Sequence, residues 1–254
     1  MQPEERQKRI EEYLLKTEFA SLDELSEQVD ASVSTVRRDL GLLEEKGTVR
    51  RTHGGARVIN PKSDEFTFTA RETHQLDEKE AIGRTCAALI GPNQTVILDA
   101  GTTVYHVARH LELKSPQIIT NSLPVANLFS GANKAEVVVT GGVIYPRLGV
   151  LVGPLAVEAF GKIRADVAVM SAGGISLDGV SNSHGLLIDI QRAMIHAARK
   201  IIFCLDHTKF GRPSISFLCP LDAIDTIVTD AAAPADLVRD LRKRKIEVIL
   251  ADTL

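Results

Sequence analysis

The chain has few of the features that mark disulfide-rich, membrane or metal-binding proteins. Its three cysteines, Cys86, Cys204 and Cys219, are far apart in apolar surroundings. An odd count without a CxxC motif or a Cys/His cluster argues against a disulfide framework and a metal site. No apolar run approaches the length that spans a bilayer, and the stretch MQPEERQKRIEEYL is too charged for a signal peptide. We therefore expect packed free thiols, no metal, no membrane partner and a cytoplasmic location.

Two common phosphate-binding motifs are also missing. Neither GxGxxG nor GxxxxGK[ST] occurs, so a dinucleotide site and a P-loop find little support. The 254 residues, 44% hydrophobic and 25% charged, are ordinary for a globular protein of one or two domains. The net charge of −3 gives no overall attraction to nucleic acid, but residues 34–62 hold seven basic and three acidic side chains. That local excess suits an anionic partner.

The first sixty residues predict a winged helix-turn-helix. Ser21 precedes LDELSEQV, and Glu24 follows three residues later, as in a capping box that opens a helix. After a short polar turn, VSTVRRDLGLLEEKG (33–47) places its apolar residues on one helical face. Two short helices joined by a tight turn form a helix-turn-helix. The stretch TVRRTHGGARV (48–58) then indicates a two-stranded wing around a Gly-Gly turn.

The residue types on the second helix and the wing suit DNA. In this motif the second helix enters the major groove with its N-terminal residues toward the bases. Arginine reads guanine with two hydrogen bonds, hydroxyls approach bases or phosphates, and wing cations add sequence-independent phosphate contacts. The alternative is a solvated helix face with incidental arginines. The DNA-contacting residues that we predict are Ser34, Thr35, Arg37, Arg38, Arg50, Arg51 and His53.

The composition predicts three segments: residues 1–58 as the DNA-binding domain, 59–75 as a linker, and 76–254 as an α/β domain. The linker mixes Pro, Ser, Asp and Thr with little periodicity. From about residue 94, apolar runs such as TVILD (95–99) and KIIFCLD (200–206) alternate with helical stretches. Strands buried on both faces and alternating with helices indicate an open, mostly parallel sheet.

Small and polar residues follow several of these strands. Ligands of such sheets bind at the carboxyl ends of the strands. There, small residues let backbone amides approach an anion, helix N-termini favour negative charge, and a lysine adds a full charge. The alternative is ordinary turn chemistry. We predict a phosphorylated small ligand bound by Asp99, Gly101, Thr102, Thr103, Asn121, Ser122, Gly141, Gly142, Gly173, Gly174 and Lys209.

The whole chain resembles the DeoR/GlpR family of bacterial transcriptional regulators. The resemblance rests on residues 21–56, KEAIG (79–83), LDAGTT (98–103), ITNS (119–122), VTGG (139–142), AGGIS (172–176), QRAMI (191–195), DHTKF (206–210) and IDTIVTD (224–230). It implies a winged helix-turn-helix joined to a sensor domain similar to ribose-5-phosphate isomerase. It also implies a homo-oligomeric repressor, dimer or tetramer, that binds double-stranded operator DNA and responds to a phosphorylated sugar, without a cofactor.

This sequence departs from that pattern at Leu186 and Leu187, where many relatives carry acidic residues, and at His184. The departures leave the identity and polarity of the ligand open.

An isomerase with a DNA-binding appendage is the alternative function. Isomerising an aldose phosphate needs a carboxylate base next to the substrate carbon. In isomerases of the implied fold this base is a glutamate after a Gly-rich turn, but residues 173–187 contain no glutamate. The remaining candidates are Asp99, Asp166, Asp178, Asp189 and Asp206. We therefore predict a sensor without catalytic residues.

Overall fold

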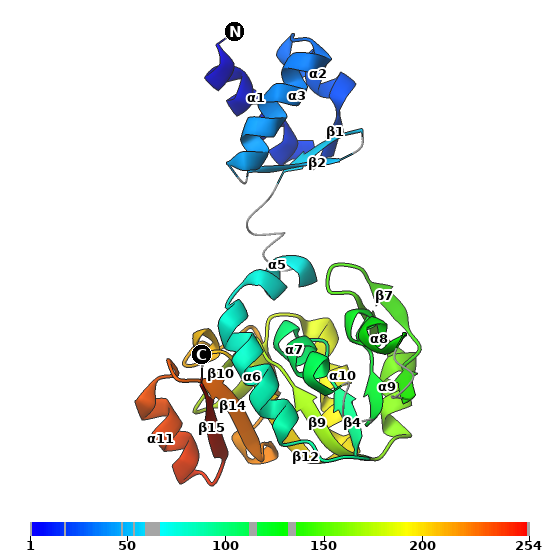
Figure 1. Ribbon diagram of the computed structural model, residues 1–254, viewed down its shortest axis with the longest axis vertical. Helices are drawn as coiled ribbons and strands as arrows, with labels where there is room; N and C mark the ends of the chain where they lie inside the picture. The colour runs from blue at the N-terminus through cyan, green and yellow to red at the C-terminus, as the bar shows by residue number, and fades with distance from the viewer. Residues whose placement is uncertain are drawn as a thin grey trace. The chain divides into compact units, whose positions relative to one another are not determined.

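The computed structural model describes residues 2–17, 19–46, 48–52, 54–58, 67–111, 116–131 and 136–252. The chain divides into two compact units, residues 1–67 and 68–254 (Figure 1). The division falls inside the predicted linker. Its residues 59–66 lie outside the described ranges, and its residues Phe68–Thr73 form a helix, α5, of the second unit.

In its described residues, the first unit has three helices and a small antiparallel sheet. The helices are α1 (Pro3–Thr17), α2 (Leu22–Val29) and α3 (Val33–Glu45). The strands are β1 (Phe19–Ser21), β3 (Gly55–Val58) and β2 (Val49–Thr52), in this spatial order. Ile10, Leu14, Leu25 and Leu40 are fully buried between them. A Cβ at Gly55 would lie 2.1 Å from the Ala20 carbonyl oxygen, so glycine is what allows β3 to approach β1.

The second unit is built on a seven-stranded sheet in the order β15-β14-β12-β9-β4-β5-β6. Every neighbouring pair is parallel, which confirms the predicted α/β class. The strands are β4 (Thr95–Leu98), β5 (Gln117–Thr120), β6 (Glu136–Val139), β9 (Ala165–Met170), β12 (Ala198–Cys204), β14 (Thr226–Asp230) and β15 (Glu247–Ala251).

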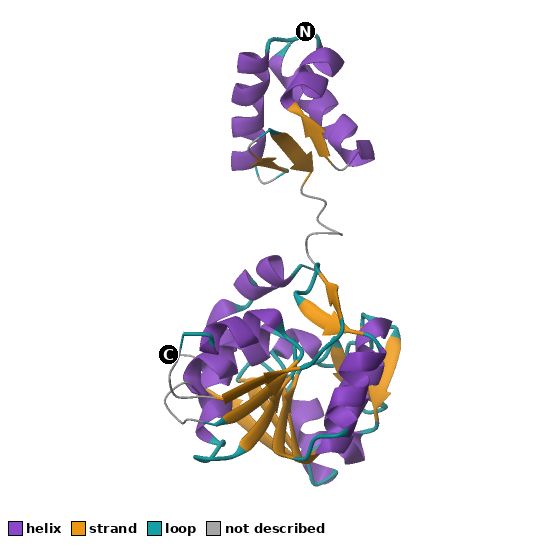
Figure 2. Ribbon diagram, turned by 90° about the vertical axis from the view of Figure 1, so that its right-hand side faces the viewer, coloured by secondary structure: helices purple, strands orange, loops and turns teal. Residues whose placement is uncertain are grey.

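Helices cover both faces of this sheet (Figure 2). One apolar core joins Val96 and Leu98 to α6 (Leu76–Ala88), α7 (Thr102–Leu111) and α8 (Leu123–Phe129). The other core joins Ile97 to α9 (Pro154–Gly161), α10 (Gly185–Ala197) and α11 (Ala235–Lys243). Successive strand residues point to opposite faces, so the continuous apolar runs of the sequence serve both cores.

Smaller elements complete the second unit. They are the hairpin of β7 (Val143–Tyr145) and β8 (Val150–Val152), the sheet of β10 (Gly174–Ser176), β11 (Gly179–Asn182) and β13 (Ser216–Cys219), and the short helices η2 (His207–Lys209) and η3 (Leu221–Ala223). Of the helices in the described part of the chain, none has the length and apolar character that crossing a bilayer requires.

Strand order locates the place where ligands bind such sheets. From β4 the chain adds β5 and β6 on one side, and then returns to place β9 and β12 on the other side of β4. The direction of strand addition therefore reverses between β4 and β9. A crevice forms at such a switch point, outside the carboxyl ends of the strands.

Candidate functional site

The N-terminus of α3 is held by a hydroxyl cluster. Ser32 is the N-cap, and its Oγ accepts the Thr35 N–H at 3.3 Å. The hydroxyls of Ser34 and Thr35 each lie 2.9 Å from that Oγ. The preceding helix shows the predicted capping box between Ser21 and Glu24. The start of α3 is therefore ordered, with Ser34 exposed and Thr35 half-buried.

Arg37 and Arg38 are exposed on α3, as a base-reading role requires. The next residue, Asp39, is buried and accepts from Arg6 Nε at 2.5 Å and from Gln7 Nε2 at 3.3 Å. The Asp39 carboxylate raises the pKa of Arg6 by this hydrogen bond. Asp39 thus fixes α3 on α1, while the two arginines that precede it, Arg37 and Arg38, are exposed.

The wing offers less free charge than its sequence suggests. Arg51 Nε donates to Glu44 Oε2 at 2.6 Å, and its backbone N–H donates to Glu44 Oε1 at 2.9 Å. These contacts join β2 to the end of α3. The side chain of Arg50 and all of His53 lie outside the described residues. DNA contact by the predicted wing residues stays a prediction.

In the second unit, Asp99 lies at the switch point and is buried at the end of β4. Its carboxylate accepts four hydrogen bonds, from the N–H of Ala100 at 2.7 Å, from the N–H and Oγ of Ser171 at 3.0 Å, and from Gln191 Nε2 at 2.8 Å. Burial raises the pKa of Asp99, and these hydrogen bonds oppose that rise. Asp99 therefore joins β4, β9 and α10, and its oxygens are occupied by the protein itself.

Gly101, Thr102 and Thr103 follow Asp99 into α7. A Cβ at Gly101 would lie 1.9 Å from Ser171 Oγ, so only glycine lets the two loops meet here. Thr102 and Thr103 are buried in the first turn of α7. The first amides of a helix have no carbonyl partner within it and favour an anion.

Three cations approach this crevice from three elements, and we call Arg71, Lys79 and Lys209 the cation cluster. Arg71 lies on α5, Lys79 on α6 and Lys209 on η2. The pKa of Lys79 is lowered to about 8, chiefly by burial, while the positive charges of Arg71 and Lys209 add to the fall and Asp206 and Glu72 oppose it. Burial also lowers the pKa of Arg71, with Asp99 and Asp206 opposing. Two contacts show that these groups are close: Lys79 Nζ donates to the Arg71 carbonyl oxygen, and Lys209 Nζ lies 4.0 Å from Asp206 Oδ2.

The two aspartates beside the cation cluster accept hydrogen bonds from the protein itself. Asp99 holds its four donors, and Asp206 accepts from the N–H of Thr208 at 3.0 Å and from its hydroxyl. Lys209 Nζ lies 4.0 Å from Asp206 Oδ2. Lys79 Nζ donates to the carbonyls of Arg71 and His74, and within the described ranges the Arg71 guanidinium makes no ion pair. The charges of Asp99, Asp206 and Glu72 act on this cluster. Because Asp99 and Asp206 already accept hydrogen bonds within the protein, we expect the three cations to attract an anion.

Other predicted ligand residues have packing roles in the structure. Asn121 Nδ2 donates to the Leu151 carbonyl oxygen at 3.0 Å, and the Leu151 N–H donates to the Asn121 carbonyl oxygen at 2.8 Å. Ser122 caps α8. Gly142 has φ +139 at the turn into β7, and Gly141 is exposed. These residues connect β5, α8 and the β7–β8 hairpin.

Gly173 and Gly174 admit a neighbouring loop. A Cβ at Gly174 would lie 1.7 Å from the Arg212 carbonyl oxygen, and one at Gly173 would lie 2.6 Å from Ser214 Oγ. Of the two leucines noted in the sequence, Leu186 is 63% exposed and Leu187 is packed in a core. A ligand-contacting role for these residues stays a prediction.

The remaining aspartates do not converge on the crevice. Asp166 lies at the start of β9, at the amino ends of the strands and so away from the crevice, and it accepts the Thr95 N–H at 3.0 Å. Asp178 is exposed in the β10–β11 turn, and Asp189 is exposed on α10. Within the described ranges, no group of three or more His, Cys, Asp or Glu side chains is placed to hold a metal ion.

Sequence reasoning missed Arg71, Lys79 and Gln191 as members of the site. Lys79 and Gln191 lie in stretches noted for other reasons, KEAIG and QRAMI, so a polar residue inside an apolar helix pattern was the available signal. Arg71 had no signal, because its surroundings read as a linker.

Comparison with known families assigns both units. The family described as DeoR C terminal sensor domain matches residues 74–231, and the one described as DeoR-like helix-turn-helix domain matches residues 6–62. Together they cover most of the chain.

Individual relatives match over nearly their full length. GolR of Listeria innocua serovar 6a, an HTH-type transcriptional regulator, is 31% identical over 99% of this chain and 100% of its own. The repressor CsqR of Escherichia coli K12 is 35% identical over 91% of this chain and 89% of its own. The repressor GlcR of Bacillus subtilis 168 is 30% identical over 99% and 98%. These relatives bear the names of regulators, not of enzymes.

Among solved structures, ribose 5-phosphate isomerase A of Methanocaldococcus jannaschii aligns with a TM-score of 0.38 and 12% identity over 52% of this chain and 53% of its own. A likeness at this level supports no argument about ligand or chemistry. The assignment rests instead on the two domain matches and on relatives that are about a third identical. On these grounds, the chain belongs to the DeoR family of transcriptional regulators.

Proposed function

We propose that this protein is a cytoplasmic, homo-oligomeric repressor of a carbohydrate catabolism operon that releases its operator when a phosphorylated sugar binds the cation cluster. The observation that carries the ligand assignment is that Arg71, Lys79 and Lys209, on three different elements, all lie close to Asp206 and near Asp99 at the start of α7. A phosphate dianion accepts hydrogen bonds from such a group of cationic donors. The protein acts as a sensor rather than a catalyst, because Asp99 accepts four hydrogen bonds within the protein and one oxygen of Asp206 accepts two.

The DNA side of the proposal rests on α3. Arg37 and Arg38 are exposed beside an ordered helix N-terminus, where helix-turn-helix proteins contact base edges. Each chain carries one such helix. Two copies would read two half-sites related by a two-fold axis, so we expect a palindromic operator.

The coupling between ligand and DNA runs through α5. This helix starts at Phe68, the first residue of the second unit. The Phe68 N–H donates to the Arg147 carbonyl at 3.1 Å, and its ring lies 5.3 Å from that of Tyr105. Because Arg71 is on α5, a ligand that draws in its guanidinium repositions the helix that connects to the DNA-binding unit. Coupling follows if the ligand binds one arrangement of α5 better than the other.

The first experiment is a thermal-shift panel of sugar phosphates, the matching free sugars and inorganic phosphate. A ligand at 100 times its dissociation constant adds about 2.7 kcal/mol of stability. We expect one sugar phosphate to raise the melting temperature and its free sugar to have no effect. The same compound should then release operator DNA in a fluorescence anisotropy titration.

Two variants test the site itself. Lys209→Ala should abolish the thermal shift and the DNA release while leaving operator affinity unchanged. The matched control is Lys162→Ala, at the exposed C-cap lysine of α9 that pairs with Glu158, which should respond like the unmodified protein. A fully responsive Lys209→Ala protein would remove this lysine from the ligand site.

A further inference from the structure

Strand β6 ends the seven-stranded sheet, and in the part of the chain that the structure describes it pairs only with β5. The Thr140 N–H, just after the strand, donates to the Thr120 carbonyl of β5 at 3.1 Å. Successive amides of a strand point to opposite sides. Those of Val137 and Val139 therefore point away from β5, so the strand presents a hydrogen-bonding edge.

The sequence of β6 is that of an interior strand. It reads Glu-Val-Val-Val, the apolar run typical of parallel strands covered on both faces, yet Val138 and Val139 are each 41% exposed. Exposed edges are usually protected by lysine, proline or a bulge. Between Glu136 and Tyr145 there is neither lysine nor proline.

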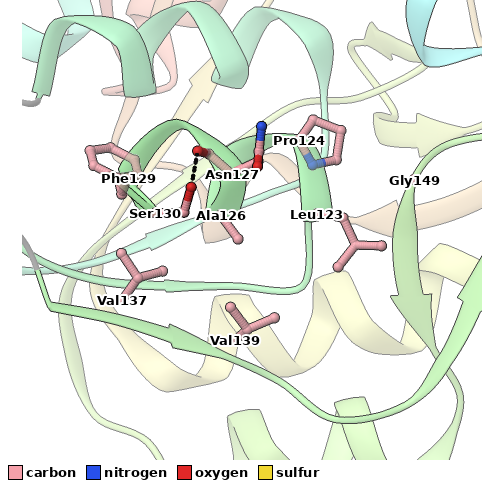
Figure 3. Close-up of a pocket in the computed structure, with 9 residues that line it drawn as sticks. All are labelled: Leu123, Pro124, Ala126, Asn127, Phe129, Ser130, Val137, Val139 and Gly149. Atoms are coloured by element: carbon pink, nitrogen blue, oxygen red, sulfur yellow. Dashed lines mark hydrogen bonds between the residues drawn. The ribbon is translucent and has the colours of Figure 1, made fainter. Parts of the chain in front are cut away.

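The apolar surface extends onto both faces of this edge. On one face, Val137 and Val139 line an open groove of about 860 Å³ beneath α8, together with Leu123, Ala126 and Phe129 (Figure 3). On the other face, exposed Val138 lies on the side of α9, whose Leu155 is 65% exposed. A Cβ at Gly141 would lie 3.9 Å from Leu155 Cβ, so α9 lies directly beside the segment that follows β6.

From this placement we infer that β6 is a homodimer interface, where β6 of a second copy pairs antiparallel and continues the sheet across both chains. In the antiparallel register that uses both outward amides, Val137 faces the partner's Val139. In this register Val138 of one copy faces Val138 of the other, and Glu136 of one copy faces Thr140 of the other. No like charges therefore oppose each other. One patch serves both chains, as a two-fold interface requires. Apolar edges on two copies bury each other, while the backbone amides and carbonyls find partners.

A palindromic operator, as the proposed function requires, needs two reading helices and therefore two chains. On this basis, which rests on the proposed function, we take a second copy as the occupant of the edge.

The size of the patch limits the affinity of the dimer. A standard interface takes about 20–30 residues a side, whereas this patch consists of the four-residue strand β6, the groove beneath α8 and the exposed Leu155 of α9. We therefore expect dissociation constants on the order of micromolar.

Sedimentation velocity of the full chain, without DNA or effector, tests the interface. Across the micromolar range the unmodified protein should rise from 27.6 kDa toward twice that mass. Val138→Lys places two lysines opposite each other at the two-fold axis, and it should associate at least tenfold more weakly. An equimolar mixture of Val138→Lys and Val138→Glu should regain association, because each new pair joins opposite charges. The matched control is Ile215→Lys, an 89% exposed apolar residue elsewhere, which should associate like the unmodified protein.

A cross-link tests the register without depending on the stability of charged variants. Residues directly opposite each other have Cβ atoms about 4.5–5.5 Å apart, so oxidised Val138→Cys should form a covalent dimer on a non-reducing gel and Ile215→Cys should not. The three native cysteines are buried. The interface is wrong if folded Val138→Cys does not cross-link or if Val138→Lys associates normally. It is also wrong if the mixture of charged variants remains monomeric, or if the unmodified chain remains monomeric at every concentration. Loss of the effector response alone would leave this interface intact.

Discussion

The side-chain nitrogen of Gln191 on α10 lies 2.8 Å from the carboxylate of Asp99, which stands 92 positions earlier at the end of β4. The same nitrogen lies 3.0 Å from the Ser171 carbonyl oxygen, and Gln191 Oε1 accepts from Asn182 Nδ2 at 2.9 Å. One buried amide thus bonds to the ends of two central strands and to β11. Its removal tests whether Asp99 is a structural anchor.

Gln191→Met keeps the length of the side chain but leaves the Asp99 carboxylate and the Asn182 amide short of a partner. Unsatisfied buried groups cost about 1–3 kcal/mol each. We expect a loss of about 2–3 kcal/mol, visible as a urea midpoint lowered by about 1 M in circular dichroism. Gln117→Met, at an exposed glutamine of β5, is the control. An unchanged midpoint for Gln191→Met would mean that Asp99 does not depend on this amide.

Ser32→Ala removes the N-cap of α3 and the acceptor shared by Ser34 and Thr35. Loss of an N-cap costs about 1 kcal/mol. We expect the DNA-binding unit to unfold at a lower temperature and operator affinity to fall with it. Ser32→Asn keeps a capping side chain and should preserve stability. If both variants unfold alike, the hydroxyl cluster does not hold the start of α3.

Arg37→Ala tests base reading by α3. A base contact is worth about 1–3 kcal/mol, so affinity for the operator should fall about fivefold to 150-fold while affinity for scrambled DNA changes little. Anisotropy titrations on the two duplexes measure the ratio. Lys8→Ala, on the 77% exposed lysine side chain of α1, should leave the ratio unchanged. Equal losses on both duplexes would place Arg37 on the phosphates instead.

Ligand binding should weaken between pH 7 and pH 9. Burial holds the pKa of Lys79 at about 8, so its positive charge is present below this value and lost above it. A sugar phosphate is already a dianion at pH 7, since its second pKa is about 6, and it does not change over this range. The melting-temperature shift caused by the sugar phosphate should therefore be smaller at pH 9 than at pH 7.

The stability of the ligand-free protein should depend on pH in the opposite direction. A lowered lysine pKa means that the unfolded chain binds the proton more tightly, so stability from this group rises as the pH increases above about 8. Lys79→Arg keeps its charge through the range and should remove the pH dependence of ligand binding. A ligand shift that is equal at both pH values in the unmodified protein would exclude Lys79 from the site.

The DNA-binding unit and the class of the second unit could be predicted because their signals are local. The capping box needs only Ser21 and Glu24, and the apolar runs that pair in the sheet are visible in four or five residues. β1 and the β7–β8 hairpin could not be predicted, because strands of three residues carry no measurable alternation. Their pairing depends on distant contacts, such as Ala20 against Ala56.

The candidate site was predicted only in part, because residue type does not separate a ligand from an anchor. Asp99 and Gly101 lie at the carboxyl end of β4, and ligand contact by them stays a prediction. Donors to Asp99 come from residues 72 and 92 positions away. Arg71 belongs to a six-residue helix without apolar periodicity. Only the folded chain reveals that it lies beside Lys79 and Lys209.

The ammonium group of Lys79 takes part in two equilibria: it stabilises the C-terminal end of α5 through hydrogen bonds, and it is a proposed donor to the bound phosphate. An isolated helix of six residues is far too short to be stable in water, and this one has the carbonyls of Arg71 and His74 tethered by Lys79. A bound phosphate competes for the same protons, so filling the crevice and melting the end of α5 are thermodynamically linked. Linkage is reciprocal. Under the proposed function, operator DNA alters the affinity for the sugar phosphate by the same factor by which the sugar phosphate alters the affinity for the operator. The concentration of sugar phosphate that the protein responds to would then depend on the DNA sequence as well as on the pocket.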